Sequence, residues 1–422
     1  MRFFRNNLTS SQETPGCIRA SGEITWANGE VFTLWVDVPS MYGESLSEMG
    51  NPWLLAMLPI AASLGEDIEL SLPVDALLLE SLKGVLAIWR EWYPDLHDVQ
   101  IRCPVKAYSV QDKALAGKRT VAFFSGGIDS YFSVVRRMPG NELGIPAVGK
   151  VDDLLTVWGF DVGVHDEVQF RPLGNILAQH ASDLNLNHII VRTNLRDIPI
   201  FKKQWGPLTH AVGLVFIALL LDVLYERVVI GSSDTYAYLT PWGSHPMLDI
   251  LFSTSSLQVI HDGASYSRME KTAFVSRIPF VGRALHVCQA LGSTNCSQCE
   301  KCLRSMIAID ILDAKDAFLG AFDWSLYSLE KIRKLYINGK PTLFVYKEMI
   351  DSAKTKNKGE IVKALQRAYH HSKILAPMVH AAEWLESKPF MWRFGRALKT
   401  ILLSGSIGPR YIHHLKKLSD SE

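Results

Sequence analysis

Apolar residues in the middle of the chain form short runs, and these runs alternate with longer segments in which apolar residues recur at helical spacing. The short runs predict strands and the longer segments predict helices. The predicted strands are residues 120–124, 154–160, 188–192, 227–231 and 257–260, and the predicted helices are residues 129–137, 167–184, 205–224 and 266–277. Strict alternation of this kind is typical of an α/β fold with a doubly wound parallel sheet, which we expect over residues 117–315.

The first 116 residues have a different pattern and predict a small α+β domain. Two runs of alternating apolar residues, 23–26 and 30–36, flank Asn28 and Gly29, and this combination is a strong hairpin signal. A helix is predicted further on, where apolar side chains repeat at helical spacing and Pro94 ends the run. Its apolar stripe is expected to pack in the core and consists of Leu78, Leu82, Val85 and Trp89.

The last part of the chain, residues 316–422, is expected to be mostly helical. Residues 388–418 contain seven lysines and arginines, several aromatic residues and no acidic residue. A solvated helical face explains this segment most simply. Contact with nucleic acid, with a phosphorylated ligand or with an acidic partner is the alternative.

Composition narrows the class of protein. The 422 residues are 48% hydrophobic and 21% charged, which is typical of a globular protein. The net charge of +1 is too small to attract the protein as a whole to nucleic acid or to a membrane surface. The longest apolar stretch, residues 211–225, contains Gly213 and Asp222 and is too short to span a bilayer, so we expect a buried helix. The N-terminus lacks the apolar core of a signal peptide, and four of the six cysteines are close together, which predicts a cytoplasmic protein with a metal site.

The main candidate for a ligand-binding and catalytic site is a glycine turn between the first predicted strand and the first predicted helix of the α/β region. Adjacent glycines allow an anion to approach main-chain N–H groups, and a helix start adds unpaired donors. A Walker motif is excluded, because no lysine follows in the required position. The turn comprises Ser125, Gly126, Gly127, Ile128, Asp129 and Ser130. This hexapeptide resembles the signature of the PP-loop ATP pyrophosphatases, which implies a loop that holds pyrophosphate during attack of a substrate oxygen on the α-phosphorus of ATP.

A group of cysteines with the spacing C-x7-C-x2-C-x2-C predicts a metal site. Four thiolates suit tetrahedral Zn²⁺ in a structural role, and an all-cysteine ligand set also leaves an iron–sulfur cluster open. The predicted ligands are Cys288, Cys296, Cys299 and Cys302. His286 is expected to be a neighbour of the site or a surface residue, and not a ligand.

The loop and the cysteines together resemble the 7-cyano-7-deazaguanine synthase family over about residues 117–315. The resemblance implies an adenine-nucleotide hydrolase-like fold, and it implies that Lys271 contacts phosphates; a surface charge is the alternative for this lysine. The substrate-recognition stretch of that family is missing, and residues 236–249 take its place. Synthase-like proteins with extra domains also occur in anti-phage systems, which implies modification of a protein or nucleotide partner.

Further candidate residues follow the other predicted strands, at the edge where open α/β sheets bind ligands. Gly159, Phe160 and Asp161 are expected near the adenine and ribose, Arg192 near a phosphate, and Gly231 in a turn beside the loop. Asp161 could instead be a simple turn residue. Four more polar residues, His245, His261, Asp262 and Arg268, lie near strand ends and could assist proton transfer, or could only cap a helix and order a loop. His210 is equally compatible with a functional or a purely buried role.

The main hypothesis is a carbon–nitrogen ligase that adenylates a carboxylate or amide oxygen and then transfers it to nitrogen. ATP, Mg²⁺ and Zn²⁺ are the expected cofactors, and Asp129, Ser130 and Lys271 the expected catalytic residues. The expected substrate is a small heterocyclic acid, for example a 7-deazaguanine-type acid. The flanking domains could bind a protein partner. The alternatives are an RNA- or nucleotide-modifying enzyme of the thiolation type and a non-catalytic, zinc-stabilised nucleotide sensor. No membrane association is expected, and nucleic acid is not the favoured partner.

Overall fold

The computed structural model of this chain describes residues 1–3, 6–107, 119–138, 149–288, 295–337, 340–388 and 390–403. Five strands at one end of the sheet are mutually parallel, in the order β13-β12-β9-β10-β11. Their bounds are β9 (Arg119–Phe123), β10 (Asp153–Trp158), β11 (Asn187–Thr193), β12 (Tyr225–Gly231) and β13 (Gln258–Asp262). These strands confirm the predicted α/β class and its mostly parallel sheet.

The same sheet continues into the N-terminal part of the chain. Strand β4 pairs antiparallel with β11, placing Asp37 opposite Arg192 and Val36 opposite Thr193. The order then runs β4-β3-β1-β5-β7, with β2 paired to β3, so the described residues contain one sheet of eleven strands. These strands are β1 (Arg2–Phe3), β2 (Asn6–Ser10), β3 (Cys17–Thr25), β4 (Val31–Pro39), β5 (Ile68–Leu70) and β7 (Ile101–Arg102). Two further short strands, β6 (Val74–Asp75) and β8 (Val105–Lys106), pair with each other.

The hairpin predicted around Asn28 and Gly29 is confirmed, with longer strands than expected. Strands β3 and β4 pair from Cys17–Pro39 at the open end to Thr25–Val31 beside the turn. Gly29 has a φ of +87°, a conformation that suits glycine. Leu34, Val36 and Val38 of β4 are buried, but Trp35 and Asp37 between them are buried as well, so burial does not alternate along this strand as the pattern predicts.

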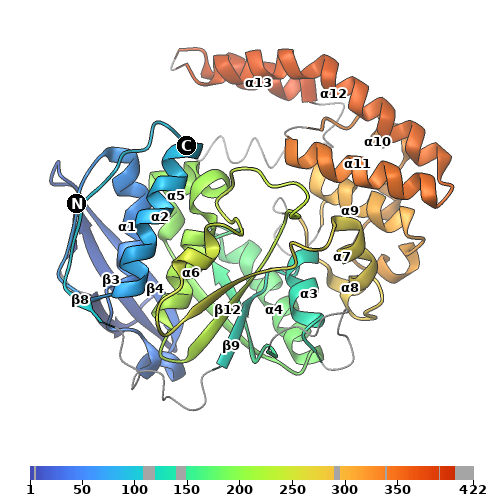
Figure 1. Cartoon of the computed structure of the whole chain (residues 1–422). Coiled ribbons are helices and arrows are strands. Elements are labelled where there is room, and N and C mark those ends of the chain that lie inside the picture. The colour runs from blue at the N-terminus through green and yellow to red at the C-terminus, as the bar shows by residue number, and fades with distance from the viewer. Residues whose placement is uncertain are drawn as a thin grey trace.

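Helices cover both faces of the sheet (Figure 1). Neighbouring residues of β9 alternate between two cores, because Val121 and Phe123 belong to one and Ala122 to the other. The first core includes residues of α1 (Asn51–Leu64), α2 (Ala76–Trp92) and α6 (His210–Leu220). The second includes residues of α3 (Ile128–Val135), α4 (Glu167–Asp183), α7 (Arg268–Val275) and α9 (Glu300–Ile311). Two short helices, α5 (Pro199–Lys203) and α8 (Val281–Ala284), complete this part of the chain.

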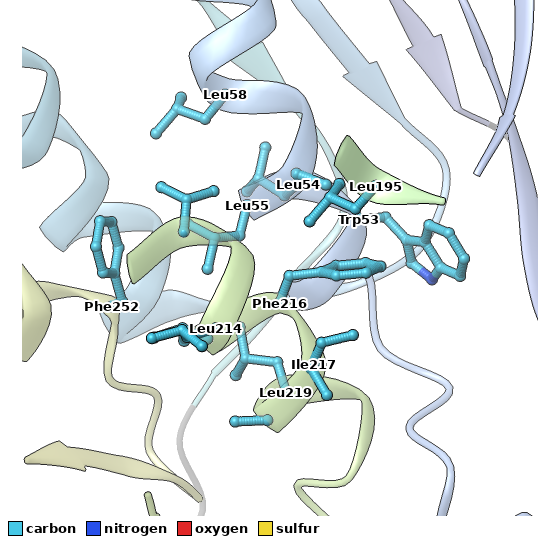
Figure 2. Packing of buried hydrophobic residues seen from close by; sticks show 14 of the residues in the cluster. Trp53, Leu54, Leu55, Leu58, Leu195, Leu214, Phe216, Ile217, Leu219 and Phe252 are labelled. Atoms are coloured by element: carbon cyan, nitrogen blue, oxygen red, sulfur yellow. The ribbon is translucent and has the colours of Figure 1, made fainter. Parts of the chain in front are cut away.

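Helix α6 is the apolar segment near the middle of the chain. All of its residues after His210 are buried, which confirms the predicted buried helix, and it packs against α1 of the N-terminal part (Figure 2). The helix predicted over 205–224 is shorter than expected. It begins as a wide π-helical turn at Trp205–Thr209, and Pro207 in that turn has no N–H to donate. Among the described residues, no helix is both long enough and apolar enough to cross a membrane.

The C-terminal region is helical where it is described. It contains α10 (Leu329–Arg333), α11 (Lys340–Thr355), α12 (Gly359–Glu386) and α13 (Trp392–Leu403). Residues of α11 and the first half of α12 belong to the second core. The second half of α12 projects beyond this core and forms an arm together with α13 (Figure 1). Lys399 pairs with Glu383 and Glu386, so part of the basic segment is neutralised within the arm; residues 404–418 of that segment lie outside the described residues.

We predict that Phe216→Ala destabilises the whole protein, because the ring of Phe216 packs at 5.9 Å from that of Trp53 and joins α6 to the N-terminal part. The expected loss is about 3–5 kcal/mol, and unfolding should remain a single transition because both parts share one core. Denaturant unfolding followed by circular dichroism and tryptophan fluorescence measures both quantities. Val168→Ala, at a side chain with 86% exposure, is the control. Separate transitions for the two parts would contradict the shared core.

Candidate active site and metal centre

The glycine turn lies between the end of β9 and the start of α3, as predicted. Gly126 has a φ of +76°, and a Cβ added there would lie 2.8 Å from the Leu177 side chain. Gly127 differs, because its φ is −86° and an added Cβ would meet only ordinary contacts at 3.5 Å. The fold therefore requires glycine at the first position but not at the second, which leaves ligand approach as a reason for Gly127.

Helix α3 begins directly after this turn, with Gly127 as its N-cap and no side chain bonded to its first N–H groups. The first N–H groups of a helix have no partner within the helix and carry partial positive charge. The Ser130 hydroxyl donates to the Gly127 carbonyl at 2.9 Å, which closes the turn. The turn and the helix start together provide donors suited to an anion.

Asp129 is paired with two cations from α7. Arg268 Nη2 lies 2.9 Å from one carboxylate oxygen, and Lys271 Nζ lies 3.4 Å from the other. Burial opposes the charged form of Asp129, but the two cations outweigh it, so the pKa of Asp129 lies below its ordinary value. The ion pairs therefore stabilise the fold above the ordinary carboxyl pKa, and this stabilisation is lost as the pH falls through the lowered pKa.

Lys271 is buried, with 1% of the residue exposed, so the surface alternative for this lysine is wrong. Its ammonium donates to the Ser232 carbonyl at 2.5 Å, which ties α7 to the end of β12. Burial lowers the pKa of Lys271, and the Asp129 charge partly offsets this effect. The buried ammonium of Lys271, the N–H groups of the glycine turn and the start of α3 therefore place positive charge in one region beneath the protein surface.

A cavity of about 180 Å³ lies at the carboxyl end of β9, β10 and β12, beside the turn. Among the predicted site residues, those that line it are Ser125, Asp129, Ser130, Phe160, Asp161 and Gly231. Gly126, Gly127 and Ile128 form the turn itself, and Lys271 lies behind Asp129. The remaining walls are mainly apolar, with Leu155, Val157, Phe170, Leu173 and Leu177 among them. An apolar cavity with a few polar groups at one end is the usual form of a small-molecule site.

Two of the predicted glycines are needed for close packing around this cavity. A Cβ on Gly231 would lie 2.9 Å from the Asp129 carbonyl oxygen, because the end of β12 crosses close to α3. Gly159 has a φ of +114°, and a Cβ there would lie 2.1 Å from the Thr193 carbonyl oxygen. Gly159 also explains why β10 ends at Trp158, two residues before the predicted end.

Arg192 is not among the residues that line the cavity. Its guanidinium pairs with Glu13 at 3.1 Å and stacks between the rings of Trp35 and Trp158, at 5.2 and 4.7 Å. It also lies 3.8 Å from the buried carboxylate of Asp37. These contacts join β11 to the N-terminal strands, and they depend on a pairing between β4 and β11 that the sequence pattern did not indicate.

The cavity wall also contains Trp205, His210 and His286. The sequence left the role of His210 open and predicted no place in the cavity for the other two. Burial lowers the pKa of His210, and its Nδ1 has no hydrogen-bond partner among the described residues. The N–H of His286 donates to the Gly126 carbonyl at 2.8 Å, so this residue holds the glycine turn. In the sequence these residues share only one feature: each is a polar or aromatic residue near a predicted helix start or a cysteine. This feature is too frequent in proteins to predict a site residue by itself.

The other polar residues near strand ends form internal pairs. Asp262 pairs with Arg136 and Arg137 at 2.5 and 2.8 Å, so it does not cap a helix; α7 is capped by Ser267. His261 pairs with Asp249 at 2.7 Å, and the N–H of His245 donates to the same carboxylate.

The four predicted metal ligands converge. The Sγ atoms of Cys288, Cys296, Cys299 and Cys302 all lie within 4.8 Å of one another, and all four residues are buried. Two of the separations are 3.8 and 3.9 Å. Four sulfurs at about 2.3 Å from one tetrahedral zinc would be about 3.8 Å apart, so this donor set fits Zn²⁺.

Backbone contacts prepare the turn that carries these cysteines. The N–H of Cys299 points to Cys296 Sγ at 3.2 Å, and the N–H of Cys302 points to Cys299 Sγ at 3.4 Å. Cys299 is also the N-cap of α9, where thiolate charge is favourable. The Asn295 side chain accepts from the N–H of Cys288 and donates to the Leu285 carbonyl, which positions the upstream ligand.

We predict that Cys302→Ser abolishes stoichiometric metal binding and lowers the melting temperature, because the buried cluster then lacks its fourth thiolate. Elemental analysis and differential scanning fluorimetry measure the two effects. Cys103→Ser, at a partly buried cysteine outside the cluster, is the control. Visible absorption typical of iron–sulfur clusters in the anaerobically purified protein would contradict the assignment to zinc.

Comparisons of this chain with protein-family models, with curated proteins and with solved structures found no match. The interpretation of the site therefore depends on its residues and geometry. The features that carry it are a glycine turn at a helix start, a buried Lys271 paired with Asp129, and an apolar cavity beside them.

Proposed function

We propose that this protein is an ATP-dependent ligase that adenylates a carboxylate or amide oxygen, releases pyrophosphate and transfers the activated group to a nitrogen nucleophile. The observation that carries the proposal is the glycine turn at the start of α3, with Lys271 and Arg268 held against Asp129 beside it. Donors of this number and charge suit the pyrophosphate leaving group, on which negative charge develops.

Each group has a defined task in this reaction. The N–H groups of the turn and the helix start bind phosphate oxygens. Lys271 and Arg268 neutralise the leaving pyrophosphate, and Asp129 fixes the positions of these two cations. Mg²⁺ that accompanies ATP takes ligands from phosphates and water and needs few carboxylates. Asp129 and Asp161, which line the cavity, would be nearest to it.

The apolar part of the cavity suits the adenine base. Val157, next to the last residue of β10, and Phe160, two residues after the strand ends, both line it, as expected for residues near the base and ribose. Thr156, which precedes them, donates to the Phe124 carbonyl at 2.6 Å and so keeps the end of β10 close to the turn. A bound nucleotide would then place its phosphates toward Ser125 and Asp129.

The acceptor is proposed to be a small heterocyclic acid of the 7-deazaguanine type, attached to a protein partner as in synthase-like anti-phage proteins. Support for this choice comes from the four cysteines. The segment 236–249 replaces the substrate-recognition stretch of the resembling family and is the part of the chain that would select the acid. This segment lies against the start of α6, since the N–H of Ala211 donates to the Gly243 carbonyl, and it therefore borders the cavity side that holds His210.

The zinc site has a structural role in this proposal. Cys288 lies two residues after His286, whose N–H holds the Gly126 carbonyl. A metal at the cysteines therefore fixes a residue that supports the turn, without contributing to the chemistry itself.

Sulfur transfer is less well supported. The two cysteines outside the cluster, Cys17 and Cys103, are partly buried, and burial raises the pKa of both thiols. A raised pKa disfavours the thiolate that would carry sulfur.

We predict that the purified protein converts ATP to AMP and pyrophosphate when Mg²⁺, 7-carboxy-7-deazaguanine and ammonia are present. Chromatography of nucleotides and a coupled pyrophosphate assay measure this. Asp129→Ala should reduce the rate by about 100-fold or more, because Lys271 and Arg268 lose the partner that positions them. Production of ADP and phosphate, or full activity of Asp129→Ala, would contradict the proposed function.

We predict that Gly127→Ala leaves the melting temperature unchanged but weakens ATP binding by about tenfold or more, because the new methyl group obstructs phosphate approach to the turn. Isothermal titration calorimetry with ATP measures the affinity. Gly163→Ala is the control, since a Cβ there has nothing within 4 Å. Equal affinity of Gly127→Ala and the unchanged protein would show that the phosphates do not bind at this turn.

A further inference from the structure

Three ring-bearing side chains, which we call the aromatic wall, form one side of the cavity: Phe160, Trp205 and His210. The ring of Trp205 contacts both of the others, with centroid distances of 4.7 Å to Phe160 and 5.2 Å to His210. The Arg196 guanidinium lies 4.7 Å from the Trp205 ring and donates to the Phe160 carbonyl. These contacts fix the positions of the rings relative to one another.

The wide turn at the start of α6 brings Trp205 and His210 to the same cavity. In a regular α-helix, residues five positions apart point about 140° away from each other. Residues 205–209 instead form a π-helical turn, whose hydrogen bonds span five residues, and both side chains line the cavity. Gly213 makes room for the larger ring, since a Cβ there would lie 2.8 Å from Trp205. The local helix geometry therefore presents the wall to a ligand.

The segment 236–249 holds this turn in place. The N–H of Ala211 donates to the Gly243 carbonyl at 2.9 Å, and the N–H of Gly243 donates to the Gly206 carbonyl at 2.8 Å. A Cβ on Gly206 would lie 2.4 Å from the Trp242 ring, so the two segments are in close contact. The part of the chain that would select the acid thus braces the backbone of the aromatic wall.

His210 supplies the polar group of the wall. Its Nδ1 is buried and has no hydrogen-bond partner among the described residues, whereas buried ring nitrogens are normally hydrogen-bonded. Two other polar side chains that line the cavity already donate within the protein, Ser130 to the Gly127 carbonyl and Thr156 to the Phe124 carbonyl. Burial lowers the pKa of His210, so the ring is neutral near pH 7 and has one donor and one acceptor nitrogen.

We propose that the aromatic wall binds the heterocyclic ring of the acid, and that His210 selects this ring by a hydrogen bond to its polar edge. This role rests on the proposed ligase function and assigns one side of the cavity to the acid. A planar heterocycle stacks well on aromatic rings, and a neutral imidazole complements a ring N–H or a ring carbonyl. The nucleotide base then uses the α4 side of the cavity, where Phe170, Leu173 and Leu177 are apolar.

Equilibrium binding tests this role in the full-length protein without requiring turnover. Isothermal titration calorimetry measures the affinity for ATP and the affinity for 7-carboxy-7-deazaguanine, the latter with and without α,β-methylene-ATP. His210→Phe keeps an aromatic ring but removes both nitrogens, and His210→Asn retains a polar amide. His371→Phe is the matched control, because the Nδ1 of His371 on α12 is also buried without a partner among the described residues and His371 does not line the cavity. ATP–pyrophosphate exchange reports whether the bound acid is adenylated.

For His210→Phe we expect the dissociation constant of the acid to rise about tenfold or more, with the ATP affinity and the melting temperature unchanged. His210→Asn should recover part of the acid affinity, and His371→Phe should match the unchanged protein. Unchanged acid affinity in His210→Phe, or an equal loss of ATP affinity, would overturn the role of His210. Absence of acid binding by the unchanged protein would also overturn it. Binding of the acid that depends on His210 but yields no exchange would contradict the ligase function and support this binding site.

Discussion

The burial of Lys271 is the constraint on which the candidate site depends. An ammonium group removed from water costs several kcal/mol unless a carboxylate and further acceptors surround it. Asp129 from the glycine turn and the Ser232 carbonyl from the end of β12 meet this need. Three elements that are far apart in sequence must therefore come together whenever the protein folds, and the turn is held in one position.

A second set of contacts also supports the turn. His286 holds the Gly126 carbonyl, and the cysteine cluster begins two residues later. The pairing of β4 with β11, reinforced by Arg192 against Asp37 and Glu13, ties the N-terminal strands to the same sheet. The parallel strands are thus supported at one edge by the N-terminal part and at the turn by the cysteines.

Much of the fold could be predicted from sequence, because local patterns determine it. The five parallel strands, the β3–β4 hairpin and the burial of α6 follow from apolar periodicity and from Asn28–Gly29. The predicted ends of some elements were less accurate. The start of α6 depends on Pro207, and the end of β10 depends on the close contact of Gly159 with Thr193. Residues 1–116 were predicted as a separate unit, yet their strands extend the central sheet, since edge pairing leaves no periodic signal. The predicted domain boundaries themselves stay predictions.

The sequence by itself determined the glycine turn, the four cysteines and the alternation of strands and helices, because each depends on residues close together in the chain. Only the tertiary structure decided that Lys271 is buried against Asp129 and that Arg192 serves the N-terminal junction. Both depend on contacts between residues more than a hundred positions apart, and such contacts leave no pattern in local spacing. The glycine turn can thus be identified from the sequence, whereas the residues that contact it and would take part in a reaction cannot.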